Sequence, residues 1–349
     1  AKGCRNPDKE TIREANEHLR NGIECYERIR EIWQILPVLE DKMTKRYQKE
    51  YVKSLYNLAC AYGDLGPDLW DAGEILEGKV EPDPGAQTGF EKEAIENIDK
   101  ALSVMEECCA VDNPAFQTTL NLPEPIVTGR ANGFAEGVFK LYNTGKLYLQ
   151  KYHLLKQETE EDRQIAGECL TKAGRYLEAA LKFKWSPEQA SQSKDYIAER
   201  LGRVLILLGR YKDAADVIRA HMKKFSMYYI RYTLAVALIK SGRTGEAMKE
   251  LQIAMQNERS NAEMWKGYYI RYAGHIEEGN YSEALECLKK ADEHAKGAGK
   301  KSVERLAKAR VHMYKSMGDE EKYCAALTHL RQIKGNTAGA GQPAETSAA

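Results

Sequence analysis

The chain has 349 residues, which is more than one ordinary hydrophobic core organises, so we expect either several domains or one extended repeat array. Its 52 Lys and Arg residues equal its 52 Asp and Glu residues, and this balance argues against a nucleic-acid partner or a polybasic membrane binder. No stretch approaches the roughly 18 to 20 consecutive apolar residues that a membrane-spanning helix needs. We therefore expect no membrane span.

Long amphipathic helices are predicted for residues 1–65. Apolar side chains recur every seven residues between 12 and 33, which places them on one stripe of a helix. Pro37 ends this helix, and a second helix is expected from about 39 until Gly66 stops it.

An acidic, proline-rich insertion is predicted for residues 66–130, interrupted by one helix over 90–109. Six of the ten prolines lie between 67 and 125. The acids between 64 and 83 lack the D-x-D-x-D-G spacing of a calcium loop, so they predict a solvated loop rather than a metal site. The expected buried stripe of the helix is Ala94, Ile98, Ala101 and Met105. A linking helix should follow over 131–158.

A repeated pattern organises residues 159–334. A glycine follows an apolar helix, and in four of the five copies a small residue lies five positions later in the next helix, while Tyr323 holds this position in the last copy. The five glycines are Gly174, Gly209, Gly242, Gly279 and Gly318, with spacings of 35, 33, 37 and 39 residues. A glycine that adopts positive φ can end one helix just before the next begins, which makes each unit a helical hairpin. Stacked hairpins predict an all-α fold, a right-handed α-solenoid, followed by a small-residue tail over 335–349.

At these residues the sequence resembles the tetratricopeptide repeat (TPR) family. The clearest copies are carried by Gly174, Tyr176, Ala179 and Phe183, then by Gly209, Tyr211 and Ala214, with weaker copies to about 332. The N-terminal helices look like a divergent copy, split by the insertion. The resemblance implies binding of proteins or peptides in a concave groove, without catalytic chemistry or a cofactor.

Residues on the groove side of each first helix follow from counting back from the turn glycine. The candidate protein-binding residues are Tyr196, Arg203, Tyr229, Tyr232, Tyr269, Arg305, Lys308, His312 and Lys315. Acidic and amide positions precede them at Glu161, Gln164 and Glu168, so the groove runs from acids through tyrosines to bases. Two interpretations stay open: a partner surface, or charges that only solvate exposed helices.

The eight cysteines allow two interpretations as well. Cys4, Cys25, Cys108 and Cys109 are candidates for disulfides, whereas buried structural thiols would explain the scattered cysteines equally. The chain starts at Ala1, which fits either removal of an initiator Met or cleavage of a signal peptide. The second case would favour a periplasmic or extracellular location, and the first a cytoplasmic one. No P-loop, G-x-S-x-G or H-E-x-x-H occurs, so we expect no enzyme, no cofactor and no metal.

The leading hypothesis is a scaffold for protein–protein interaction that assembles head-to-tail with itself into an oligomer or filament. It rests on the polarised charge and on Ala325, Leu327 and Leu330, which no following repeat covers. One alternative is a monomeric adaptor that binds a partner peptide in the tyrosine-lined groove. Another is a helical enzyme or cofactor carrier that uses the 66–130 loops.

Overall fold

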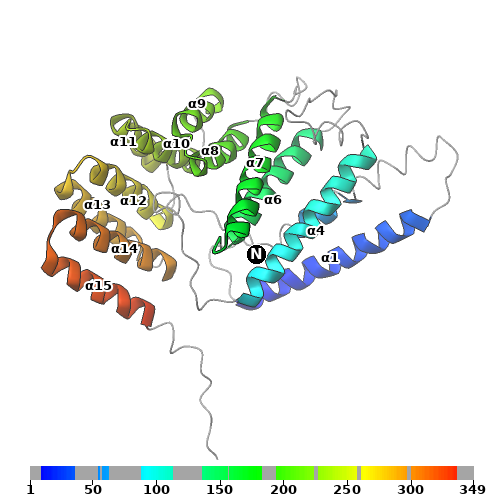
Figure 1. The fold of residues 1–349 in the computed structure, drawn as a ribbon, viewed down its shortest axis with the longest axis horizontal. Coiled ribbons are helices and arrows are strands. Elements are labelled where there is room, and N and C mark those ends of the chain that lie inside the picture. Colours follow the sequence, from blue (N-terminus) through cyan, green and yellow to red (C-terminus); the bar gives the residue numbers. More distant parts are fainter. Residues whose placement is uncertain are drawn as a thin grey trace, which may run out of the picture. The chain divides into compact units, whose positions relative to one another are not determined.

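The computed structural model describes ten stretches of the chain, and every secondary-structure element within them is a helix (Figure 1). The described residues are 9–35, 54–55, 57–62, 88–112, 136–155, 157–182, 194–223, 227–257, 261–296 and 300–335. These stretches form two compact units, unit 1 up to residue 210 and unit 2 from residue 211, a boundary inside the predicted repeat region. The all-α prediction is confirmed for the described residues.

Unit 1 begins with long helices, and one of them shows the buried stripe that the sequence predicts. The helices are α1 (Lys9–Ile35), a segment over 54–62, α4 (Thr88–Asp112), α6 (Glu136–Leu154), α7 (Glu160–Lys182) and α8 (Asp195–Leu207). All four residues of the stripe predicted for α4 are buried, because this face packs inward while charged residues such as Glu93 and Lys100 stay exposed. Polar contacts tie α1 to the segment that follows it: Tyr62 Oη donates to Glu27 at 2.8 Å.

The second pair of helices in unit 1, α6 and α7, packs closely along its length. A Cβ added at Gly145 of α6 would lie 2.7 Å from Leu177 Cγ and 3.2 Å from the Ala173 carbonyl oxygen of α7, so only glycine fits there. The rings of Tyr148 and Tyr176 stack with centroids 5.7 Å apart. These contacts account for the close packing of α6 on α7.

The turn predicted at Gly174 is wrong. Helix α7 runs without interruption from Glu160 to Lys182, and Gly174 is a buried helical residue whose added Cβ would be 3.5 Å from Val204 Cγ1 of α8. The residues beside it, Ala173 and Leu177, are fully buried. Continuing the helix keeps this whole face in the core, whereas a turn would expose it.

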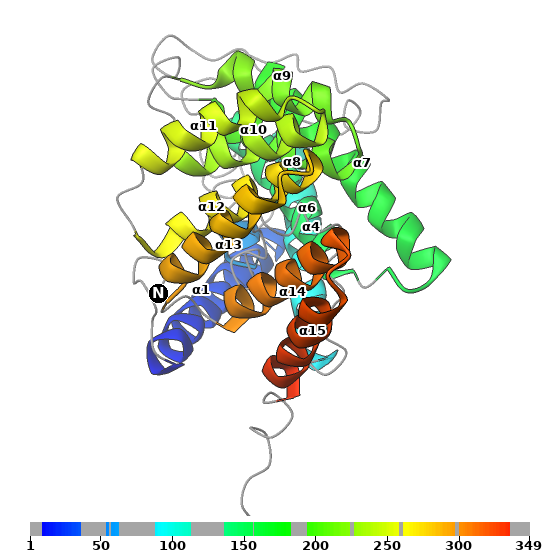
Figure 2. The same ribbon diagram turned by 90° about the vertical axis from the view of Figure 1, so that its left-hand side faces the viewer.

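Unit 2 consists of short helices that follow one another in chain order (Figures 1 and 2). Their bounds are α9 (Tyr211–His221), α10 (Tyr228–Lys240), α11 (Thr244–Asn257), α12 (Asn261–Glu277), α13 (Tyr281–His294), α14 (Lys300–Met317) and α15 (Glu320–Gly335). Helices α10 with α11, α12 with α13 and α14 with α15 pack as neighbours. This packing is consistent with a helical repeat.

Four of the five predicted glycine turns are confirmed, because the glycines adopt positive φ. The angles are +74° at Gly209, +77° at Gly242, +72° at Gly279 and +69° at Gly318. At the second of these turns the Gly242 N–H donates to the Ile239 carbonyl at 2.9 Å and the Arg243 N–H to the Leu238 carbonyl at 2.8 Å. This hydrogen-bond pair closes the end of a helix and requires a left-handed residue, which glycine adopts without steric cost.

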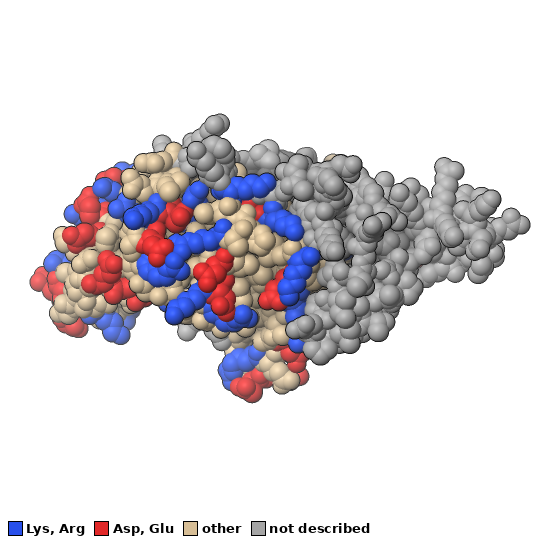
Figure 3. Space-filling model, turned by 90° about the horizontal axis from the view of Figure 1, so that it is seen from above, with Lys and Arg blue, Asp and Glu red and all other residues tan. Residues whose placement is uncertain are grey.

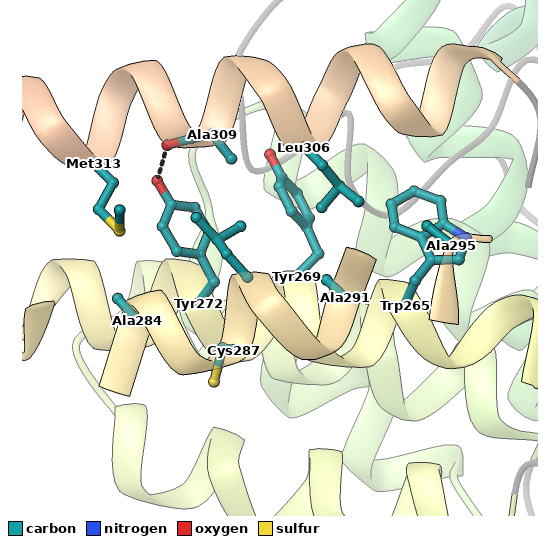
Figure 4. Packing of buried hydrophobic residues seen from close by; sticks show 11 residues of the cluster. Trp265, Tyr269, Tyr272, Ala284, Cys287, Ala291, Ala295, Leu306, Ala309 and Met313 are labelled. Atoms are coloured by element: carbon teal, nitrogen blue, oxygen red, sulfur yellow. Dashed lines mark hydrogen bonds between the residues drawn. The ribbon is translucent and has the colours of Figure 1, made fainter. Parts of the chain in front are cut away.

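An aromatic ladder on α12 forms the core of the last two hairpins. Trp265, Tyr269 and Tyr272 point toward α14, where they meet Leu306, Ala309 and Met313 (Figure 4). Tyr272 Oη donates to the Ala309 carbonyl oxygen at 2.9 Å, which satisfies a buried hydroxyl inside the apolar cluster. The handedness of the superhelix stays a prediction, and most of the predicted 66–130 insertion and the 335–349 tail lie outside the described residues.

Candidate protein-interaction surface

The first candidate groove residues lie on α8, where they take part in the packing of unit 1. Tyr196 is half-buried, and its ring meets that of Tyr142 edge to face with centroids 5.1 Å apart. Arg203 is only 3% exposed and donates from Nε to Glu199, one helical turn earlier. These side chains are directed into packed surroundings rather than toward solvent.

The candidate tyrosines of the middle repeats are core residues or lie beside the core. Tyr232 is 1% exposed and Tyr269 3% exposed, while Tyr229 is half-buried with its ring centroid 6.1 Å from that of Tyr228. Residues 230–239 of α10 are all buried, so this helix presents no groove side to solvent. In this conformation the buried rings offer no face to a partner.

The basic end of the predicted groove does reach solvent. On α14, Lys308 is half-buried and lies 3.2 Å from Glu304, while His312 and Lys315 are exposed. His312 Nδ1 is 3.3 Å from Tyr272 Oη, so one side of the imidazole ring contacts α12. Arg305 differs from the others, because it is buried with its guanidinium carbon 5.9 Å from the ring centroid of Trp265.

The acidic positions at the beginning of α7 are exposed as well. Thr159 and Asp162 cap the helix reciprocally: the Asp162 N–H donates to Thr159 Oγ1 at 3.0 Å, and the Thr159 N–H to Asp162 Oδ2 at 3.3 Å. Past this cap, Glu161, Gln164 and Glu168 all lie on the surface. Acids near a helix N-terminus are favoured by the helix dipole, which stabilises the acidic end of α7.

Other exposed charges do not form a surface of one sign. On the face drawn in Figure 3, Lys and Arg side chains alternate with Asp and Glu side chains over the described part. Glu246 of α11 illustrates the local role of such charges. Arg243 and Arg219 donate to its carboxylate at 2.7 and 2.5 Å and lower its pKa to about 2. This carboxylate therefore links the turn before α11 to α9.

The cysteine thiols of the described residues are not paired in disulfides. Cys25 and Cys324 are exposed free thiols, and Cys169 and Cys287 are buried ones. Burial raises the pKa of the Cys169 and Cys287 thiols above the usual value, which makes them less reactive. The disulfide predicted for Cys25 is therefore wrong in this structure, because its thiol is free at the surface of α1. Cys4 and the side chains of Cys108 and Cys109 lie outside the description, so these three candidates stay predictions.

Within the described stretches, no three His, Cys, Asp or Glu side chains gather as a metal site would require. None of the helices described is both long and apolar enough to traverse a bilayer.

Comparison with known proteins adds no relative. No protein-family model matches the chain, and no curated protein matches its sequence. The resemblance to tetratricopeptide repeats therefore rests on the repeat pattern alone.

The burial of α10 is the feature that counting from the turn glycines missed. The run Ile-Arg-Tyr-Thr-Leu-Ala-Val-Ala-Leu-Ile over 230–239 contains one charged residue, and such a run is typical of a helix buried on all sides. That signal was available in the sequence. Together, the described candidate positions leave two exposed charged faces, an acidic one on α7 and a basic one on α14.

Proposed function

We propose that this protein is a non-catalytic helical scaffold that binds proteins and assembles head-to-tail with copies of itself. The observation that supports it best is the pair of exposed faces of opposite charge on two different helices. Glu161 and Glu168 represent the acidic face of α7, and Lys308 and Lys315 the basic face of α14. Complementary faces at different places on one chain favour heterologous contacts, which produce rings or filaments according to whether they close.

The repeat architecture supports a scaffold in general. We assign the hairpins of unit 2 to the tetratricopeptide type, arranged as a right-handed solenoid, because helices joined by positive-φ glycine turns follow one another in series. Such arrays commonly present an extended binding surface. Here the exposed candidate positions of unit 2 belong to α14.

A monomeric adaptor that binds an acidic peptide on α14 is the second candidate. Exposure of His312 and Lys315 favours it, because bases at a solvent-accessible face attract carboxylates. The buried Tyr232 and Tyr269 argue against the tyrosine-lined version of this hypothesis.

Sedimentation velocity over a wide range of protein concentrations tests the proposal. We expect the average mass to rise with concentration at low salt and to fall when salt is added, because contacts between exposed charges are screened. If the mass stays equal to that of one chain at every protein concentration, even at low salt, self-assembly is rejected. The monomeric adaptor is then the remaining hypothesis.

A further inference from the structure

We infer that the exposed face of α14 in one copy binds the exposed face of α7 in a second copy, with the two helices antiparallel. The pairing places Glu161 opposite Lys315, Gln164 opposite His312, and Glu168 opposite Lys308. This inference rests on the proposed self-association and names the surface and register through which it occurs.

The docking face of α14 is open to a partner. It consists of Glu304, Lys308, Val311, His312 and Lys315, of which the last two are exposed and the first three half-buried. The spacing of these residues along α14 puts them on one side of a helix. Glu304 is the acid among these five residues, and its carboxylate lies 3.2 Å from Lys308 Nζ. Lys308, His312 and Lys315 are bases, so bases predominate on this face.

The occupant is identified by its complementary charge. The face of α7 consists of Glu161, Gln164, Ile165, Glu168 and Lys172, all exposed except the half-buried Ile165. Gln164 Nε2 donates to Glu168 Oε1 at 3.3 Å, which holds the amide and the carboxylate on the same side of the helix. The α7 face therefore presents two carboxylates that can pair with the two ammonium groups of the α14 face.

The spacing of the charges matches on the two helices. Glu161 and Glu168 are seven residues apart, as are Lys308 and Lys315. Seven residues of an α-helix rise about 10.5 Å, so both carboxylates reach both ammonium groups at once when the helices lie alongside each other.

The remaining side chains choose the direction. In the antiparallel register Ile165 faces Val311, which forms an apolar pair. Lys172 faces Glu304, so here the base lies on α7 and the acid on α14, and the two charges again attract. In the parallel register Ile165 would face His312 and Gln164 would face Val311, each a polar group against an apolar one. Antiparallel helices also oppose their dipoles favourably.

Charge reversal tests the contact in the full chain. One variant carries Lys308→Glu and Lys315→Glu, and another carries Glu161→Lys and Glu168→Lys. We expect each alone to weaken self-association by at least about tenfold in Kd, because like charges then face each other. An equimolar mixture of the two variants should associate again, since each supplies the face that complements the other.

A matched control separates this contact from net charge. Lys212→Glu with Lys249→Glu, at exposed positions of α9 and α11, changes the net charge by the same amount as Lys308→Glu with Lys315→Glu. We expect this control to associate like the unaltered chain. Equal weakening by the control, or no recovery in the mixture, would overturn the inference. Helical circular dichroism and thermal unfolding confirm that each variant folds.

Paired substitutions within one chain test the register. Glu161→Lys should be rescued by adding Lys315→Glu to the same chain and not by adding Lys308→Glu, because every contact then joins an altered α7 face to an altered α14 face; the opposite pattern would overturn the antiparallel register. An unaltered chain that stays monomeric would reject the proposed function as well. An unaltered chain that associates as strongly as its charge-reversed variants would reject only the α7–α14 contact.

Discussion

The tripeptide Gly-Arg-Tyr occurs in this chain at 174–176 and at 209–211, with two different structures. At the first place it lies inside the continuous helix α7, where Gly174 is buried against α8. At the second it forms the turn after α8, where Gly209 has φ +74° and is exposed. The same local sequence therefore permits a turn without requiring one.

The surroundings explain the difference. In α7 the residues on both sides of Gly174 pack against α6, and Tyr176 stacks on Tyr148, so a turn would remove apolar surface from the core. At 208–210 the chain is exposed, and continuing the helix would bury nothing there. At 174–176 the packing of α7 over a long interface keeps the chain helical. At 209–211 the conformational freedom of glycine allows a turn.

Removal of a large buried ring tests whether the two units have separate cores. Trp265→Ala should destabilise unit 2 by about 3–5 kcal/mol, because a large buried ring is removed from the α12 ladder. Hydrogen exchange should accelerate in α12–α15 and stay slow in α6 and α7. Leu208→Ala, at an exposed leucine, is the control and should change little. Equal acceleration in α6 and α7 would contradict separate cores.

A second substitution tests the close approach of α6 to α7. Gly145→Val should destabilise unit 1 by about 1–3 kcal/mol, because its Cβ would collide with Leu177 and overpack the core. Gly167→Val, at an exposed helical glycine with no atom within 4 Å of an added Cβ, is the matched control. Thermal unfolding of both variants measures the difference, and similar melting temperatures would disprove tight packing at Gly145.

Alanine at two glycines should have effects of opposite sign. Gly279→Ala should destabilise the fold by about 1–2 kcal/mol, because alanine is strained at positive φ. Gly174→Ala should stabilise it by about 0.5–1 kcal/mol, since a helical alanine is favoured and its Cβ makes an ordinary contact with Val204. Chemical denaturation measures both changes. Destabilisation of similar size at both positions would refute the difference between the two regions.

The last prediction concerns the free energy of unfolding of unit 2 at low pH. Arg243 and Arg219 lower the pKa of Glu246 to about 2 from the ordinary value of 4.5, so the carboxylate stabilises unit 2 above pH 4.5 and loses this contribution as the pH falls toward 2. Glu246→Gln should therefore lower stability at neutral pH and reduce the loss between these two pH values. Urea unfolding at several pH values measures it. The unaltered chain measured in parallel is the reference, and an equal loss of stability in both proteins would contradict this role of Glu246.

Helix positions and turns were largely predictable because they depend on neighbours in the sequence. The stripe of α4, the end of α10 at Gly242 and the absence of strands among the described residues follow from periodicity and from glycine chemistry. The candidate groove was predictable only in part. Counting from the glycines identifies a side of each helix, yet whether that side meets solvent depends on what packs against it.

Periodicity and glycine positions in the sequence already predict a helical chain, the turns of the unit 2 hairpins, and the places where acids and bases concentrate. Packing between distant segments explains why Gly174 continues a helix, why Tyr232 and Tyr269 are core residues, and why the charged faces of α7 and α14 reach solvent. The two kinds of information act over different distances along the chain. Propensity and periodicity act within a few residues, whereas burial depends on segments far apart in the chain.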